Sequence, residues 1–303
     1  MTYNVSGKVV FVTGAARGIG AETARMLASR GAHLALVGLE PDRLAALAEE
    51  LGEHHVWFEC DVTDQSALER AASGTIAALG GIDVVVANAG IASNCTVAVG
   101  PLDALIRIIE VNLIGVVRTV SCTLPHVTDA CGYYLLVSSA AALAPLPGIS
   151  TYAAAKSGVE QFGNVLRLEV AHKGVSVGVA HPSWIDTDMV RDVRNDLKSF
   201  NETLATLPWP FGSVTSVKTC AAAFVKAIER RKRKVYVPGT LAPFSALRYL
   251  LASPLSEYVM GRNARRLVPQ AEREALKLNR PFGLNSVETV DKLKAEDAAM
   301  RKR

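Results

Sequence analysis

The feature that most constrains the fold of this chain is a regular alternation of short apolar runs with longer segments of helical periodicity. The apolar runs are rich in β-branched residues, and most of them lack the in-and-out alternation of a half-exposed strand. Such runs are typical of a parallel sheet that helices cover on both faces. The predicted strands span residues 9–12, 32–37, 56–60, 84–87, 133–138, 175–180 and 235–237.

Helical periodicity is clearest at residues 21–30, 42–51, 65–79 and 152–172, so these segments can supply the crossover connections. We therefore predict an α/β fold, with a doubly wound, Rossmann-like sheet of seven parallel strands. The alternation stops after Gly239, and the remaining residues are helix-like. A length of 303 residues fits one large domain plus an appendage. We assign residues 1–240 to one α/β domain and residues 241–303 to a helical C-terminal extension.

A glycine-rich segment stands between the first predicted strand and the first predicted helix, with glycines at positions 14, 18 and 20. The backbone N–H groups at the start of a helix bind a diphosphate, and glycines let the backbone approach it closely. The alternative is a plain glycine turn. The position of the segment, directly after a strand, favours a dinucleotide site.

The spacing Gly14-xxx-Gly18-x-Gly20 differs from the GxGxxG of ordinary Rossmann dehydrogenases and resembles the TGxxxGxG loop of short-chain dehydrogenases and reductases. Further motifs follow in that family's order over roughly the first 240 residues. They are Asp61-Val62, Asn88-Ala89-Gly90, Asn112, Ser139, the YxxxK pair Tyr152 and Lys156, and a segment at residues 181–187 similar to the family's PGxxxT.

The resemblance implies a catalytic tetrad of Asn112, Ser139, Tyr152 and Lys156, in which Asn112 holds a water that links Lys156 to solvent. It also implies that Ile185 and Thr187 hold the nicotinamide carboxamide, although Ser183 replaces the usual glycine and leaves the path of that loop open. The implied cofactor contacts are Gly14, Arg17, Gly18, Ile19, Gly20, Gly38, Leu39, Asp61, Val62, Asn88, Ala89, Gly90, Tyr152, Lys156, Pro182, Ile185 and Thr187.

The residue types of the tetrad suit hydride-transfer chemistry. A tyrosine can take a proton from an alcohol or give one to a ketone, but its ordinary pKa near 10 calls for a nearby cation. Lys156 follows Tyr152 by one helical turn on the same face and could supply that cation. Ser139 follows a predicted strand, where its hydroxyl could donate to a developing oxyanion. We predict an NAD(P)-dependent oxidoreductase; the alternative is a noncatalytic dinucleotide-binding or membrane-surface interaction protein.

The segment after Thr187 predicts a bulky, apolar alcohol or ketone as substrate, with core packing of the same residues as the alternative. The side chains expected to line the pocket are Met189, Phe200, Leu204, Leu207, Trp209 and Phe211. Cofactor choice leans to NADP, because Gly38 stands where NAD-preferring relatives carry an acid. Leu39 stands where NADP enzymes often place an arginine, however, and Glu40 could turn inward, so NAD stays open.

A net charge of +4 gives no general field for nucleic acid, so none is expected as a partner. The cysteines are odd in number and lack metal spacing, and the histidines have no ligand partners at metal spacing, so we expect free thiols and no metal site. The N-terminus lacks a signal-peptide pattern, and no uninterrupted apolar run approaches about 18 residues, which predicts a cytoplasmic protein. A homo-oligomer is expected by analogy with the family alone.

Residues 241–251 have apolar positions spaced for one helix face, with Arg248 at its edge. Basic residues lie nearby at 230–234, 262, 265 and 266. This combination predicts that the C-terminal region covers the substrate entrance and contacts a membrane surface peripherally. The alternative is a solvated charge run and a helix docked on its own domain or on a partner subunit.

Overall fold

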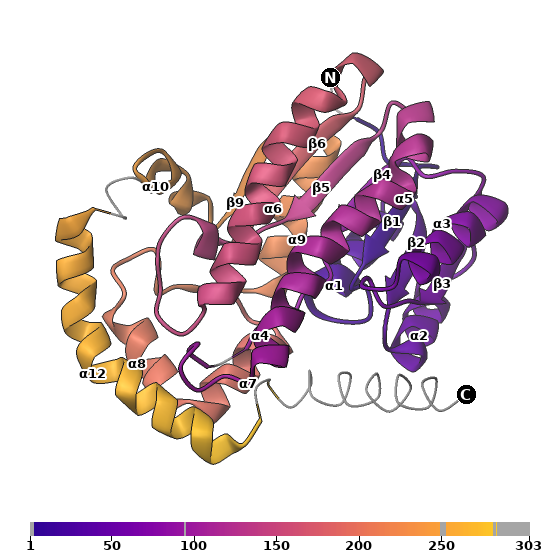
Figure 1. Cartoon of the computed structure of the whole chain (residues 1–303). Coiled ribbons are helices and arrows are strands. Elements are labelled where there is room, and N and C mark those ends of the chain that lie inside the picture. The colour runs from indigo at the N-terminus through magenta and orange to yellow at the C-terminus, as the bar shows by residue number, and fades with distance from the viewer. Residues whose placement is uncertain (1–2, 94, 249–252, 281–282, 284–303) are drawn as a thin grey trace.

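The computed structural model describes residues 3–93, 95–248, 253–280 and 283, and Figure 1 shows their arrangement. Seven parallel strands form one sheet in the order β3-β2-β1-β4-β5-β6-β9, which confirms the predicted doubly wound fold. The strands are β1 (Val9–Thr13), β2 (His33–Gly38), β3 (His55–Glu59), β4 (Val84–Ala87), β5 (Tyr133–Val137), β6 (Ser176–Pro182) and β9 (Lys234–Val237).

Helices cover both faces of this sheet (Figure 1). One face carries α1 (Gly18–Ala28), α2 (Pro41–Leu51) and α9 (Val217–Glu229), and the other carries α3 (Gln65–Leu79), α5 (Gly115–Asp129) and α6 (Ser150–Glu169). Within β1, Val10 and Val12 pack into the first core while Phe11 packs into the second. Both faces of the strands are therefore buried, which explains why the apolar runs show no polar alternation.

The sequence around Ser176 spells the GxSxG of hydrolases, but Ser176 lies inside β6, where it pairs with Tyr133 of β5. Gly178 has a packing reason, because a Cβ there would lie 2.0 Å from the Tyr133 hydroxyl and 2.3 Å from the Lys232 carbonyl oxygen. A nucleophile on a strand-to-helix elbow is thus excluded at this position.

Between β6 and α9 the chain forms a small lobe that the strand pattern did not predict. It contains a two-stranded sheet of β7 (Trp184–Ile185) and β8 (Val214–Thr215), with α7 (Asp188–Asp196) and α8 (Lys198–Thr206) between them. Each strand has only two residues, which is too short for a periodicity argument. The lobe stands beside the carboxyl ends of the strands (Figure 1).

The described residues after β9 form helical segments, which confirms the helical character predicted for the extension in this part of the chain: η4 (Gly239–Leu241), α10 (Ala242–Ala246) and α12 (Pro254–Leu278). The prediction of one amphipathic helix over residues 241–251 is wrong in its described part. Leu241 is buried in the 3₁₀ turn η4, whereas Leu247, just past α10, is about half exposed, so the two do not share a buried face. Residues 249–252 lie outside the described part. None of the helices that the structure describes is both long and apolar enough to span a bilayer.

Candidate active site

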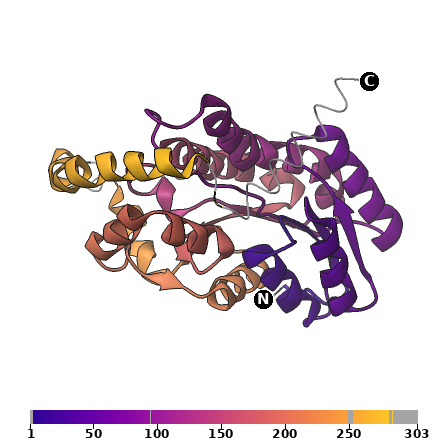
Figure 2. The same ribbon diagram turned by 90° about the horizontal axis from the view of Figure 1, so that it is seen from below.

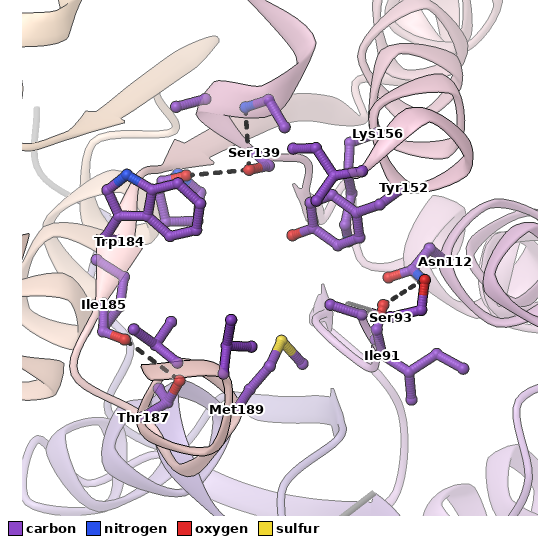
Figure 3. A pocket seen from close by; sticks show the side chains of 18 of the residues that line it. Ile91, Ser93, Asn112, Ser139, Tyr152, Lys156, Trp184, Ile185, Thr187 and Met189 are labelled. Atoms are coloured by element: carbon purple, nitrogen blue, oxygen red, sulfur yellow. Dashed lines mark hydrogen bonds between the residues drawn. The ribbon is translucent and has the colours of Figure 1, made fainter. Parts of the chain in front are cut away.

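A cavity of about 830 Å³ lies at the carboxyl ends of β1, β4, β5 and β6, and Figure 3 shows part of its lining. Open α/β sheets bind their ligands at this edge. Every residue that the sequence analysis assigned to the catalytic tetrad or to cofactor contacts lines this cavity except Gly20. The structure therefore brings together residues from the whole stretch between Gly14 and Thr187.

The glycine loop forms one end of the cavity. Gly14 and Gly18 have φ angles of +64° and +57°, which favour glycine. A Cβ at Gly20 would lie 2.1 Å from the Gly14 carbonyl oxygen, so Gly20 shapes the loop from behind instead of facing the cavity. Helix α1 begins at Gly18 without a side-chain cap, which leaves backbone N–H groups directed at the cavity for an anionic group. These residues fit the diphosphate of a dinucleotide.

Glu40, which the sequence analysis left open, lines the same end of the cavity as Arg17, Gly38 and Leu39. Its carboxylate oxygens lie 3.3 Å from Arg17 Nε and 3.7 Å from Arg43 Nε. Two guanidinium groups thus meet at the position where the second strand ends.

Asp61 is held on both of its carboxylate oxygens. Oδ1 accepts a hydrogen bond from the Thr63 backbone N–H at 2.8 Å, and Oδ2 accepts one from Arg107 Nη2. Arg107 also donates to Thr63 Oγ1 at 2.8 Å and lines the cavity. Sequence analysis missed Arg107, which lies on α4 (Leu102–Ile109); the available signal was an acidic residue at a strand end that needs a counterion.

Asn112 lies in a π-helical turn, η1 (Glu110–Ile114), that joins α4 to α5. Such turns are rare and concentrate at functional sites. The Asn112 Nδ2 group donates to the carbonyl oxygens of Ile91 at 2.8 Å and Ile108 at 2.9 Å. Its Oδ1 atom is buried and has no hydrogen-bond partner among the described residues. A Cβ at Gly90 would lie 2.6 Å from that oxygen, so Gly90 keeps the space beside it open.

Two adjacent serines follow β5, and their hydrogen bonds separate their roles. Ser138 Oγ donates to the Lys156 carbonyl oxygen at 2.7 Å, which ties β5 to α6. Ser139 Oγ accepts from the Ala141 backbone N–H at 3.1 Å and makes only a long contact of 3.4 Å to the Pro182 carbonyl oxygen. Ser139 is therefore the serine whose hydroxyl can donate to a further oxygen atom.

The Tyr152 hydroxyl points into the cavity beside Ser139 (Figure 3). Burial raises the pKa of Tyr152, and a hydrogen bond with Ser139 lowers it by less. Burial lowers the pKa of Lys156 to about 8. Lys156 Nζ donates to the Val137 carbonyl oxygen at 2.9 Å. Burial of the phenol is thus the larger of these two contributions to the tyrosine pKa. The role of Lys156 as the cation that lowers the tyrosine pKa stays a prediction.

The segment after β6 closes the cavity opposite Tyr152 (Figure 3). Pro182, Ile185 and Thr187 line it as the sequence analysis expected. Thr187 Oγ1 donates to the Ile185 carbonyl oxygen at 3.2 Å, and its Cγ2 would lie 3.4 Å from a Cβ at Gly18. This segment therefore reaches the glycine loop across the cavity.

The remaining wall is mainly apolar and comes largely from the small lobe. Of the six side chains expected there, Met189, Phe200, Leu207 and Phe211 line the cavity. The prediction is wrong for Leu204 and Trp209. The cavity-facing positions of α8 are Ser199, Phe200 and Thr203, which excludes Leu204, and Trp209 is 73% exposed in the loop that follows.

Trp184 lines the cavity instead of Trp209, although sequence analysis did not select it. Its Nε1 group donates to the Phe211 carbonyl oxygen at 2.9 Å. Its ring meets that of Phe200 edge-on at 5.0 Å. Met260 and Ala271 of α12 also border the cavity, although they lie far along the chain from every predicted site residue.

All five cysteines are free. Burial raises the pKa of Cys60 to about 12 and that of Cys122 to about 11, so neither is a ready thiolate. No group of three or more His, Cys, Asp or Glu side chains in the described ranges is arranged to hold a metal ion.

Several basic residues expected at a membrane surface are engaged elsewhere. Lys234 Nζ and Arg248 Nη1 each lie 3.4 Å from the Glu160 carboxylate, and Arg266 Nη1 lies 3.1 Å from that of Glu202. These contacts favour the alternative in which the charged residues serve the packing of the chain itself.

Comparison with known proteins identifies the family to which this fold and cavity belong. The family model for short chain dehydrogenases matches residues 8–198. The chain belongs to the short chain dehydrogenase family. This dehydrogenase is 31% identical over 264 residues to an uncharacterized oxidoreductase of Mycobacterium tuberculosis, a match that covers 84% of this chain and 98% of that protein. It is also 31% identical over 274 residues to a (−)-trans-carveol dehydrogenase of Rhodococcus erythropolis, covering 80% of this chain and 97% of the relative.

A solved structure gives the same result. A short chain dehydrogenase from Mycobacterium paratuberculosis, bound to NAD, superposes with a TM-score of 0.69 at 25% sequence identity and covers 77% of this chain and 97% of the other. The short-chain dehydrogenase is therefore an oxidoreductase that acts on CH–OH or C=O groups with a nicotinamide dinucleotide. This confirms the predicted reaction class and sets aside the noncatalytic alternative.

Proposed function

We propose that this dehydrogenase interconverts a bulky, apolar alcohol and its ketone, with Tyr152 as the group that transfers the proton. The observation that carries the proposal is the Tyr152 hydroxyl, which points into the cavity beside Ser139 and faces a largely apolar wall (Figure 3). We assign the chemistry to residues 1–240 and treat residues 241–303 as an extension that completes the wall.

The bound nicotinamide dinucleotide supplies or accepts the hydride. Around it, the chain's own residues bind, orient and move a proton. The start of α1 holds the diphosphate, and Pro182, Ile185 and Thr187 hold the nicotinamide end. A raised pKa keeps the Tyr152 phenol neutral, which is the form that donates a proton to the oxygen of a ketone. Ser139 Oγ gives up its long contact with the Pro182 carbonyl oxygen and donates a hydrogen bond to the ketone oxygen instead.

Lys156 and Asn112 form the route by which a proton returns to Tyr152. With a pKa near 8, the Lys156 amine carries a proton over the neutral range and can return one towards Tyr152. Both Lys156 and the unpartnered Asn112 Oδ1 border the space in front of Gly90, which suits a water held between them. This supports the proton link to solvent that the family resemblance implies.

The apolar wall supports the substrate class. The side chains of Met189, Phe200, Leu207 and Phe211 offer no strong hydrogen-bonding group, so the hydroxyl groups of a sugar placed against this wall would lack partners. One relative is named for the alcohol trans-carveol, which is in line with this class.

We propose NADP as the preferred dinucleotide. Gly38 places no carboxylate at the end of β2 to repel a 2′-phosphate, and Arg17 and Arg43 both reach that position. The arginines can turn from Glu40 to the phosphate. Dissociation constants for NADP and NAD test this choice, and Glu40→Gln should strengthen NADP binding because it removes a nearby negative charge. NAD bound at least tenfold tighter than NADP would overturn it.

The deciding experiment is a turnover screen of alcohols and ketones with both dinucleotides, in which the absorbance of the nicotinamide measures the turnover. We expect efficient turnover of cyclic and long-chain apolar substrates. Turnover restricted to small polar sugars contradicts the proposed substrate class, and tight dinucleotide binding without turnover of any alcohol or ketone contradicts the proposed role of Tyr152.

A further inference from the structure

Helix α12 borders the same cavity as Ser139 and Tyr152 although it lies outside the part of the chain that the family model matches. Its cavity-lining residues, Met260 and Ala271, are separated by three helical turns, or about 16 Å along the helix axis. Leu267, which is buried, shares their face because positions 260, 267 and 271 follow the helical repeat. One face of α12 therefore runs along the cavity.

Helix α12 is fixed to the small lobe by a set of polar contacts. Glu274 Oε2 accepts hydrogen bonds from Ser199 Oγ at 2.6 Å and from the Ser199 backbone N–H at 3.0 Å. Burial opposes the charge of Glu274, but hydrogen bonds from Ser199 and Gln270 outweigh it and lower the pKa of the carboxyl group. Glu202 on α8 accepts from Arg266 at 3.1 Å and from Gln270 at 3.3 Å. The helix is thus held along α8.

A contact on the opposite rim completes the attachment. Thr96 Oγ1, in the segment that follows β4, donates to Glu272 Oε1 at 2.7 Å. Figures 1 and 2 both show α12 running alongside the α7–α8 lobe, and Figure 2 shows it extending between that lobe and the segment that leads into α4. Because both rims hold it, α12 cannot retreat freely when a larger group is placed on its inner face.

We propose that α12 limits the size of the substrate and that Ala271 and Met260 are the residues that set this limit. The inference rests on the proposed function, since it concerns the substrate half of the same site. The side chain of Ala271 is a methyl group, the smallest after that of glycine. It leaves space in the cavity that a larger residue would fill. Met260 is long and unbranched, so its truncation would extend the cavity.

The test uses straight-chain methyl ketones from butanone to dodecanone as probes, on the full chain with the reduced dinucleotide. Ala271→Phe should lower kcat/KM for dodecanone at least tenfold more than kcat/KM for butanone. Met260→Ala should shift the preference in the opposite direction, towards the longest ketones. Leu276→Phe is the matched control, because Leu276 is 61% exposed on the same helix and does not border the cavity.

Calorimetric binding of dodecanone, measured on the same proteins, separates this inference from the proposed function. Binding that Ala271→Phe weakens and Leu276→Phe does not supports the role of α12 even if no ketone is turned over, in which case the proposed reaction fails alone. Equal loss of butanone and dodecanone activity in Ala271→Phe, unchanged dodecanone binding in that variant, or no binding of dodecanone by the wild type overturns the inference. Melting temperatures and Met260→Ala, which introduces no steric clash, guard against misfolding as the cause.

Discussion

The amine of Lys156 lies over the ring of Tyr152, with Nζ 5.7 Å from the ring centroid. The two groups shift in opposite directions, since burial raises the pKa of the phenol and lowers the pKa of the amine. Both shifts favour the uncharged forms. The pair therefore starts with the proton on the tyrosine, which suits donation to a ketone.

Tyr152→Phe tests that role directly. The variant removes the transferable proton and little volume, so we expect kcat to fall far more than tenfold while the dissociation constant of the dinucleotide stays near that of the wild type. Steady-state kinetics and dinucleotide titration measure the two quantities, and Tyr258→Phe, at a 66% exposed position, is the control. A variant that keeps a tenth of wild-type kcat, a barrier change of only about 1.4 kcal/mol, would sink the assignment.

The adjacent serines should respond differently to the same substitution. Ser139→Ala should lower kcat with little effect on the melting temperature, because its hydroxyl donates to a backbone carbonyl only over a long contact of 3.4 Å and accepts from the partly exposed Ala141 N–H. Ser138→Ala should cost about 1–2 kcal/mol of unfolding free energy, since it leaves the buried Lys156 carbonyl without its 2.7 Å partner. Kinetics and denaturant titration on both variants check this, and an equal loss of kcat with unchanged stability in both would contradict the separation.

Gly90→Ala should disturb the space in front of Asn112. The added carbon would lie 2.6 Å from Asn112 Oδ1 and 3.5 Å from Lys156 Nζ, so one or both side chains must shift. We expect kcat to fall roughly tenfold or more, because small displacements in an active site are costly. Gly81→Ala is the control, since a Cβ there meets nothing within 4 Å. Wild-type kcat in Gly90→Ala would argue against a role for this space.

Arg107→Met should weaken dinucleotide binding through Asp61, which the family resemblance places at the adenine. Loss of a hydrogen bond of ~0.5–1.5 kcal/mol predicts a dissociation constant roughly 2- to 13-fold higher. Nicotinamide mononucleotide lacks the adenosine half, so its binding should not change. Arg118→Met is the control, because Arg118 pairs with Glu110 at 3.2 Å and does not line the cavity. If the mononucleotide is weakened as much as the dinucleotide, Arg107 does not act at the adenosine end.

Glu160 should make the stability of the enzyme sensitive to acid. Its side chain is 5% exposed, and contact with His181, followed by the charges of Lys234 and Arg248, lowers its pKa to about 2. A carboxyl group with a depressed folded-state pKa contributes stability above its unfolded pKa, near 4.5, and loses it as the pH falls towards 2.

We therefore expect Glu160→Gln to lower the unfolding free energy at pH 7 by about 1–3 kcal/mol. The difference from the wild type should shrink by roughly 2 kcal/mol between pH 7 and pH 3. Urea titrations over that range measure it. A difference that stays constant with pH would show that Glu160 is not the group that titrates. Arg248→Met should cost less, because Arg248 is 42% exposed and its charge is screened.

The sequence by itself determined the seven-stranded sheet, the glycine loop and the positions of Asn112, Ser139, Tyr152 and Lys156. The sheet and the loop depend on local patterns, namely apolar runs and glycine spacing, whereas the four tetrad positions followed from the resemblance to the motif order of short-chain dehydrogenases. The ends of parallel strands necessarily meet at one edge, so residues that follow successive strands converge whatever the details of packing.

Only the tertiary structure decided which distant side chains complete the site. Arg107 reaches Asp61 across 46 positions of the chain, and Glu272 reaches Thr96 across 176. No local pattern encodes such pairs, because they depend on how whole helices pack against the strand ends. The same reason separates Trp184, which lines the cavity, from Trp209, which is exposed: both are apolar residues of one lobe, and the way that lobe folds back onto the sheet determines which of them faces inward.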